Sequence, residues 1–118
     1  MDVMTGKREH ETASCNLVVS NALPLGMRRK VRELHALIVP EQDRNKGYAS
    51  QLLHDVCREA DEHGMTLFLS VDGGEKLIAF YTRWGFQPIQ AKPVLMARMA
   101  GATPRTLKPI SQALAALH

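Results

Sequence analysis

The stretch LHALIVPEQDRNKGYASQLL, residues 34–53, joins an apolar segment to an amphipathic one, and it decides how the rest of the chain is interpreted. The apolar segment ends the run KVRELHALIV at 30–39, which predicts a β-strand buried on both faces toward its C-terminal end. Pro40 ends this strand because proline cannot donate a hydrogen bond to a neighbouring strand. A helix is predicted to begin near Gly47, so basic residues and a glycine fall at a strand-to-helix junction.

This junction has the features of a phosphate-binding turn. The first amides of a helix lack internal partners and point toward the incoming loop, where the helix dipole adds partial positive charge. Gly47 allows a ligand to approach the backbone closely, and Ala49 is too small to block it. Arg44 and Lys46 add positive charge. The alternative is an ordinary strand-to-helix loop, because many helix starts carry a glycine and a lysine.

The spacing of the junction excludes two common phosphate motifs. It is neither GxxxxGK[ST], the P-loop, nor GxGxxG, the dinucleotide-binding fingerprint. It does match the pattern [RQ]xxGx[GA], with Arg44, Gly47 and Ala49 at the specified positions. A six-residue pattern this loose is weak evidence alone, so the interpretation depends on its surroundings.

The helix after the junction has the clearest period in the chain. Its apolar residues recur at helical spacing and are Ala49, Leu52, Leu53, Val56, Cys57 and Ala60. Gly64 supplies a C-terminal stop. MTLFLSV at 65–71 predicts a buried strand, and DGGEK at 72–76 predicts a turn into a second helix. The apolar stripe of that helix is Leu77, Phe80, Tyr81 and Trp84, with Gly85 at its end.

Segments on either side of this centre are shorter and less regular. The polar residues 1–13 predict a flexible tail, CNLVVS at 15–20 a short strand, and KPVLMARM at 92–99 a last strand. PISQALAALH at 109–118 predicts a short helix with Ile110, Leu114 and Leu117 on one side. The expected order is therefore strand, helix, strand, helix, strand, and the first crossover is long enough to join parallel strands.

Composition limits the classes of function. A chain of 118 residues with 45% hydrophobic residues is expected to form one globular domain. The net charge of +3 is too small for a dedicated nucleic-acid binder, so no nucleic-acid partner is expected. Cys15 and Cys57 lie far apart without any paired Cys or His spacing, so no metal site is expected. No apolar run approaches the roughly 18 residues of a membrane span, and a cytoplasmic location without a membrane partner is expected.

The stretch at 34–53 and AFYTRWGF at 79–86 together resemble the two signatures of the GNAT superfamily of N-acetyltransferases. The two signatures lie at the usual family distance, with a buried strand between them, and the resemblance covers roughly residues 30–99. It implies an α/β structure, the GNAT acyl-CoA N-acyltransferase fold, in which a mixed central sheet flanked by helices splays apart where acetyl-CoA inserts. The chain departs from the pattern in lacking much of the usual N-terminal part, which normally shapes the acceptor site.

The resemblance implies which residues bind the acyl donor. The backbone of Leu37, Ile38 and Val39 would pair with the pantetheine arm as an added strand does. The pyrophosphate would be held by the junction residues Arg44, Asn45, Lys46, Gly47, Tyr48 and Ala49. No metal ion is part of this chemistry.

The resemblance also implies two catalytic residues, each with a structural alternative. Tyr81 matches the tyrosine that protonates the departing thiolate, or else it only packs on the apolar stripe of its helix. Glu33 matches a glutamate that deprotonates the incoming amine directly or through water, or else it is a solvated charge on a strand. His35 faces the same side as Glu33 and is interpreted as structural or as holding a water. Trp84 and Phe86 are predicted to be core residues.

The predicted domain organisation is a tail at 1–13, one GNAT-like domain at 14–100, and an extension at 101–118. Three functions remain open. The chain is an N-acetyltransferase acting on an unidentified amine, a non-catalytic acetyl-CoA-binding module, or an interaction protein that has kept the fold. The apolar side of the C-terminal helix favours a homodimer or partner contact, or packing on its own sheet.

Overall fold

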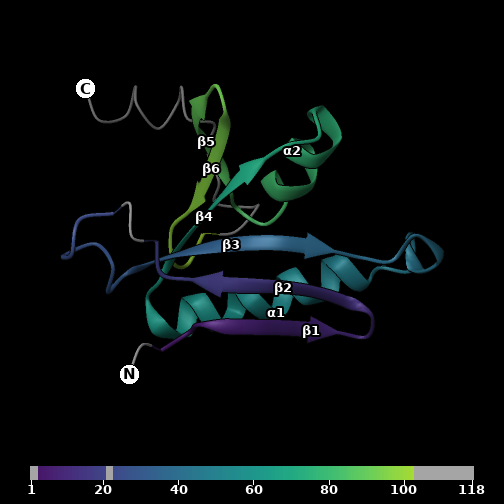
Figure 1. Cartoon of the computed structure of the whole chain (residues 1–118), viewed down its shortest axis with the longest axis horizontal. Helices are drawn as coiled ribbons and strands as arrows, with labels where there is room; N and C mark the ends of the chain where they lie inside the picture. Colours follow the sequence, from purple (N-terminus) through teal and green to yellow (C-terminus); the bar gives the residue numbers. More distant parts are fainter. Residues whose placement is uncertain (1–2, 21–22, 103–118) are drawn as a thin grey trace.

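The computed structural model describes residues 3–20 and 23–102, which form one mixed sheet and two α-helices (Figure 1). The strands are β1 (Gly6–His10), β2 (Ala13–Val18), β3 (Val31–Ile38), β4 (Thr66–Val71), β5 (Gln87–Ala91) and β6 (Val94–Arg98). The helices are α1 (Tyr48–His63) and α2 (Glu75–Thr82), with a short 3-10 helix at Glu41–Asp43. The strand order is β1-β2-β3-β4-β6-β5. The predicted helix at 109–118, and the contact expected from it, lie outside the described residues.

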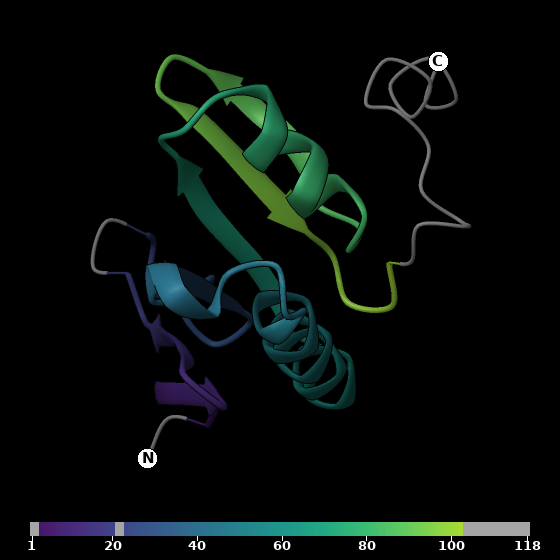
Figure 2. The same cartoon turned by 90° about the vertical axis from the view of Figure 1, so that its right-hand side faces the viewer.

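The sheet opens between its two central strands. Parallel pairing of β3 with β4 runs from Val31 opposite Thr66 to Glu33 opposite Phe68. Beyond this point the strands diverge, and Figure 2 shows β1, β2 and β3 with α1 apart from β4, β5 and β6 with α2. The two groups are called the N-terminal and C-terminal arms below. This confirms the splayed sheet that the resemblance implies.

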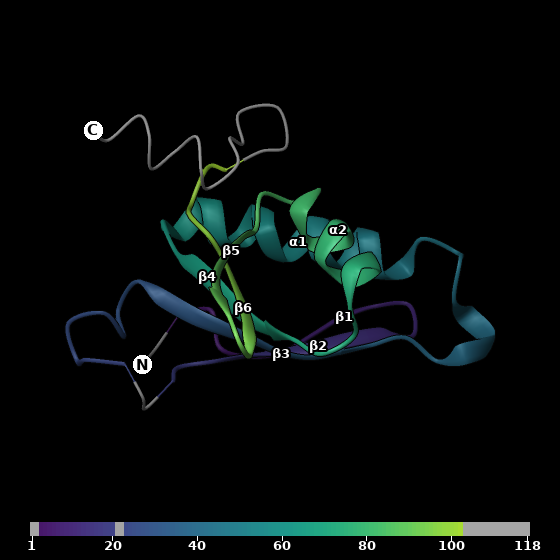
Figure 3. The same ribbon diagram turned by 90° about the horizontal axis from the view of Figure 1, so that it is seen from above.

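Helix α1 forms as its period predicts. Its buried residues are Leu52, Leu53, Val56, Cys57 and Ala60, all from the predicted apolar stripe, whereas Ala49 is half-buried. Gly64 ends the helix in the left-handed conformation, with φ of 66°, which glycine adopts without steric cost. Figure 3 shows α1 and α2 on the same side of the sheet. The core therefore lies between the helices and that face, where Leu34, Leu67 and Met96 are buried.

Two strands were not predicted. Gly6–His10 was expected to be part of a flexible tail, but it forms β1, the antiparallel partner of β2. Its pattern was missed because it holds no run of apolar residues; instead Arg8 forms two hydrogen bonds of 2.8 Å to Glu59 of α1. Gln87–Ala91 forms β5 at the other edge of the sheet. It is short, largely exposed and contains Pro88, which suits an edge strand.

The burial of β3 is opposite to the prediction. Ile38 near its C-terminal end is 58% exposed, while Arg32 near its start is 1% exposed. The end is exposed because β4 has diverged there. Arg32 is accommodated because it donates hydrogen bonds to the carbonyl oxygens of Val3, Arg28 and Val31. Of the two predicted core aromatics, Phe86 is fully buried and Trp84 is half-buried.

Candidate active site

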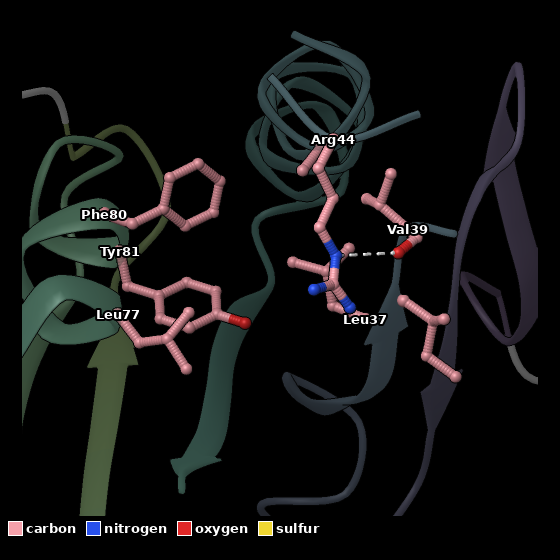
Figure 4. Close-up of a pocket in the computed structure, with 8 residues that line it drawn as sticks. Leu37, Val39, Arg44, Leu77, Phe80 and Tyr81 are labelled. Carbon is pink, nitrogen blue, oxygen red and sulfur yellow. Dashed lines mark hydrogen bonds between the residues drawn. The ribbon is translucent and has the colours of Figure 1, made fainter. Parts of the chain in front are cut away.

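A cavity of about 550 Å³ lies between the two arms (Figure 4). One wall is the end of β3 with the residue after it, and the other wall is α2. Its lining residues are Leu37, Ile38, Val39, Arg44, Ala49, Leu77, Phe80 and Tyr81. Because pairing between β3 and β4 ends at Glu33, the edge of β3 that faces this cavity has no strand partner among the described residues.

A second cavity of about 330 Å³ adjoins the first, because the two share Val39, Arg44, Ala49 and Phe80 as lining residues. Its other lining residues are Asp43, Asn45, Gly47, Tyr48 and Ser50. The two cavities together form a groove that runs from between the arms to the start of α1. This groove is called the donor groove below, after the acyl donor that the sequence resemblance implies for its residues.

The N-terminus of α1 opens onto the second cavity. Gly47 precedes the helix with φ of 82°, and it provides no side-chain cap. The first turn carries no acidic residue, so nothing on the helix neutralises the positive end of its dipole. A Cβ atom placed on Gly47 would meet no atom within 4 Å, which leaves open space in front of the first amides. This end of α1 is therefore suited to an anion.

The two basic side chains of the junction differ in placement. The Nζ atom of Lys46 lies 2.9 Å from Oδ1 of Asp43, and Lys46 lines neither cavity. Hydrogen bonds from Lys46 and from Thr12 hold the pKa of Asp43 below its usual value. Arg44 lines both cavities, and its Nε atom donates a hydrogen bond of 3.3 Å to the carbonyl oxygen of Val39.

Tyr81 presents its hydroxyl group to the donor groove. Figure 4 shows the hydroxyl pointing away from α2 toward β3, while the side chain as a whole is 7% exposed. Its ring contacts Phe80 and Phe86, with centroids 5.4 and 5.6 Å away. Burial raises the pKa of Tyr81 above its usual value of 10.0, so the phenol stays protonated at neutral pH and can donate a proton.

Glu33 lies apart from these residues. It does not line either cavity; it sits where β3 and β4 last pair, at the point from which the arms diverge. His35 is exposed two positions further along β3. Pairing of Glu33 with Val18 and of His35 with Asn16 is regular, so both side chains face the same side of the strand. The structure thus brings Tyr81 together with all the predicted donor-binding residues except Lys46, and Glu33 lies apart from them.

Some residues of the groove were missed by sequence reasoning. Leu77 and Phe80 were interpreted only as the apolar stripe of a helix, yet both line the donor groove, and Leu77 is 38% exposed. Their signal was indistinguishable from that of core residues, because a cavity wall and a core both need apolar side chains at helical spacing. Asp43 and Ser50 of the second cavity carried no signal beyond their nearness to the motif.

Residues 11–86 match the family model described as the Acetyltransferase (GNAT) family. The chain belongs to this GNAT family. No curated protein sequence matches it. The solved structures that resemble it include an N-acetyltransferase from Staphylococcus aureus Mu50, with 19% identity and a TM-score of 0.64. That match covers 75% of this chain and 61% of the other.

Two further GNAT-like structures share the fold at low sequence identity. An aminoglycoside 6'-N-acetyltransferase complexed with coenzyme A has 17% identity and a TM-score of 0.59, over 79% of this chain and 68% of that one. The ribosomal-protein-S18-alanine N-acetyltransferase from Escherichia coli has 19% identity and a TM-score of 0.55, over 82% and 66%. The chain thus spans less than two thirds of the length of the first-named relative.

The described residues contain neither a cluster of metal-binding side chains nor a membrane-spanning helix. Within residues 3–20 and 23–102, no three His, Cys, Asp or Glu side chains gather as metal ligands do. In the same residues no helix has the length and apolar character needed to cross a membrane.

Proposed function

We propose that this GNAT protein is an acetyl-CoA-dependent N-acetyltransferase that moves an acetyl group to a primary amine by direct attack in a ternary complex. The observation that carries the proposal is the donor groove itself. It leads from the uncapped N-terminus of α1 to the hydroxyl group of Tyr81, between arms of the sheet that have separated.

The groove fits the parts of acetyl-CoA in order. The unpaired edge of β3 at Leu37, together with Val39 just after the strand, offers backbone groups to the amides of an extended pantetheine arm, as an added strand would. The apolar side chains of Leu77 and Phe80 face this edge across the cavity. The open amides at Gly47 and beyond suit the pyrophosphate. Coenzyme A in the complexed aminoglycoside acetyltransferase shows that a protein of this fold holds such a ligand.

The residues of the chain would then divide the proton transfers. Glu33, directly or through a water, takes a proton from the ammonium group, because only the neutral amine attacks the thioester carbonyl. The new C–N bond forms and the C–S bond breaks as the tetrahedral intermediate collapses. The Tyr81 hydroxyl gives its proton to the departing sulfur, and the proton released by the acetylated nitrogen restores the phenol.

We propose a primary amine as the acceptor and name no particular compound. The related structures are named for acceptors as different as an aminoglycoside and an alanine of ribosomal protein S18. We place the reaction in the cytoplasm, a reducing compartment that agrees with the free thiols of Cys15 and Cys57.

Titration calorimetry of the purified protein with acetyl-CoA tests the donor half of this proposal. Binding at micromolar concentration that weakens as the phosphates are trimmed from the ligand would support it. Absence of binding at millimolar acetyl-CoA would contradict it. Release of coenzyme A thiol in the presence of a panel of primary amines then tests the transfer itself, and binding without release from any amine would favour a non-catalytic module.

A further inference from the structure

The side chain of Arg44 lies in the groove that its loop is expected to serve. Figure 4 shows its guanidinium group between Tyr81 and the end of β3, and Nε donates to the carbonyl oxygen of Val39 at 3.3 Å. Val39 belongs to the backbone segment that would pair with the pantetheine arm. An acyl donor that pairs with this segment would therefore compete with the guanidinium group for the same carbonyl oxygen and the same space.

We propose that Arg44 makes the donor groove favour acyl carriers that bear a phosphate, because any carrier must displace its contact with Val39 and only a phosphate draws the guanidinium group aside. The inference rests on the proposed function and extends it to the selection of the donor. Its ligand chemistry is an acyl pantetheine thioester that bears a phosphate at the end of the arm.

The balance of hydrogen bonds favours this exchange. The bond from Arg44 to Val39 is long, exposed and made to a neutral oxygen, so it contributes little. A guanidinium–phosphate pair is charge-assisted and often bidentate, and it is roughly twice as strong as a neutral bond. Because Arg44 also lines the second cavity beside the N-terminus of α1, it can turn toward a phosphate bound there without leaving the groove. That movement frees the Val39 carbonyl oxygen for the pantetheine arm.

Of the two basic residues at the junction, only Arg44 is placed to bind a phosphate in the donor groove. Lys46 is held by Asp43 and lines neither cavity. Among the ion pairs of the described residues, none includes Arg44, so no carboxylate holds it in either position. A thioester of bare pantetheine would have to displace the guanidinium group from Val39 and would offer no anion in return.

The test compares two ligands on two variants. Arg44→Ala and Arg44→Gln are titrated with acetyl-CoA and with acetyl-pantetheine, which is uncharged, and binding is followed by the chemical shifts of backbone amides. We expect the Kd for acetyl-CoA to rise about tenfold in Arg44→Ala, the loss of one charge-assisted contact. We expect the Kd for acetyl-pantetheine to fall about threefold or more, because a neutral hydrogen bond no longer has to be displaced.

Arg58→Gln is the matched control. Arg58 is an exposed arginine of α1 whose Nε atom lies 3.5 Å from Glu62, away from the donor groove. The Arg58→Gln substitution should change neither the Kd for acetyl-CoA nor the Kd for acetyl-pantetheine. Thermal melting of each variant checks that the fold is kept, and the Gln variant retains polarity at the position if Arg44→Ala melts early.

Two results overturn the inference in distinguishable ways. If the unmodified protein binds acetyl-CoA but both Arg44 variants bind acetyl-pantetheine no more tightly than it does, Arg44 does not disfavour that ligand and only this inference fails. If the unmodified protein binds no acetyl-CoA, the proposed function fails and the inference fails with it.

Discussion

Glu33 of β3 and Phe68 of β4 form the last parallel pair before the two strands separate. This position places the carboxylate of Glu33 at the point from which both arms of the sheet diverge. An amine that reaches the acetyl group from the open side of the sheet would pass close to this point. The proposed role of Glu33 as the base depends on this position, since Glu33 lines neither cavity of the donor groove.

Glu33→Gln tests this role. The substitution keeps the shape of the side chain and removes the base, so kcat for acetyl transfer should fall about 100-fold. The Kd for acetyl-CoA should not change, since Glu33 does not line the groove. Glu9→Gln, on the edge strand β1 where Glu9 pairs with Lys7, is the control. An unaltered kcat in Glu33→Gln would show that Glu33 is not the base and is only a solvated charge on the strand.

Tyr81→Phe separates catalysis from packing. The phenyl ring can keep the contacts with Phe80 and Phe86, so the melting temperature should stay close to that of the unmodified protein. Loss of the hydroxyl removes the proton donor, and kcat should fall about 100-fold with little change in the Kd for coenzyme A. Kinetic measurements of acetyl transfer give the rate, and calorimetry gives the Kd for coenzyme A. Equal turnover in the two proteins would show that Tyr81 only packs.

Gly47→Glu tests the anion site at the start of α1. The new side chain would enter open space in front of the helix and place a negative charge where the phosphates are expected. The Kd for acetyl-CoA should rise at least about tenfold. The unfavourable φ of 82° should also lower the free energy of unfolding by about 1 kcal/mol.

Gly64→Glu is the control for this substitution. Gly64 lies at the opposite end of α1, also with positive φ, and a Cβ atom placed on it would likewise meet no atom within 4 Å. The variant should lose stability and keep its affinity for acetyl-CoA. Equal affinities of the two variants would mean that the phosphates do not bind at the start of α1.

Asp61 and Arg98 should make stability depend on acid pH. Arg98 is 3% exposed and donates hydrogen bonds of 2.8 and 3.1 Å to Asp61, and the Gly101 N–H donates a third. Burial alone raises the pKa of Asp61, but these hydrogen bonds outweigh it and hold the pKa below the usual 3.8. The contribution is complete above the usual pKa and is lost as the pH falls through the lower pKa of the folded protein.

Urea unfolding from about pH 6 to about pH 3 measures this dependence. Asp61→Asn should be less stable near pH 6 and lose less stability on acidification. Asp55→Asn, on the exposed side of the same helix, should behave as the unmodified protein does. An equally steep loss of stability in Asp61→Asn would place the acid sensitivity elsewhere.

Neither cysteine should react with thiol reagents while the protein is folded. Burial raises the pKa of the Cys15 thiol to about 11 and that of Cys57 to about 12, and both side chains lie in the core. The thiolate, which is the reactive form, is therefore scarce at pH values near 8. Labelling with a chromogenic disulfide should be slow, and it should become rapid in denaturant. Rapid labelling of the folded protein would indicate that the core opens easily.

Much of the C-terminal two thirds of this fold can be predicted from the amino-acid sequence. Helix α1 follows from an apolar period that survives in the structure, strand β4 follows from the apolar run at 65–71, and Gly64 ends α1 as predicted. The motif of Arg44, Gly47 and Ala49 identified the junction, and these three residues do line one cavity. Such features are local, because helix period, glycine conformation and the open amides of a helix start depend on neighbours along the chain.

The remaining features arise between segments that are distant in the chain. Strand β1 exists because β2 pairs with it and because Arg8 bonds to Glu59, neither of which its own polar sequence indicates. The apolar end of β3 is exposed because β4 turns away, so the same residues that predicted a buried strand line a groove instead. Whether Lys46 faces a ligand or Asp43 was likewise decided by side chains meeting in space. The sequence by itself determined helix α1, strand β4 and the junction motif between β3 and α1, whereas only the tertiary structure decided the edge strands and which edges and side chains remain free, because pairing and burial are set by contacts across the fold.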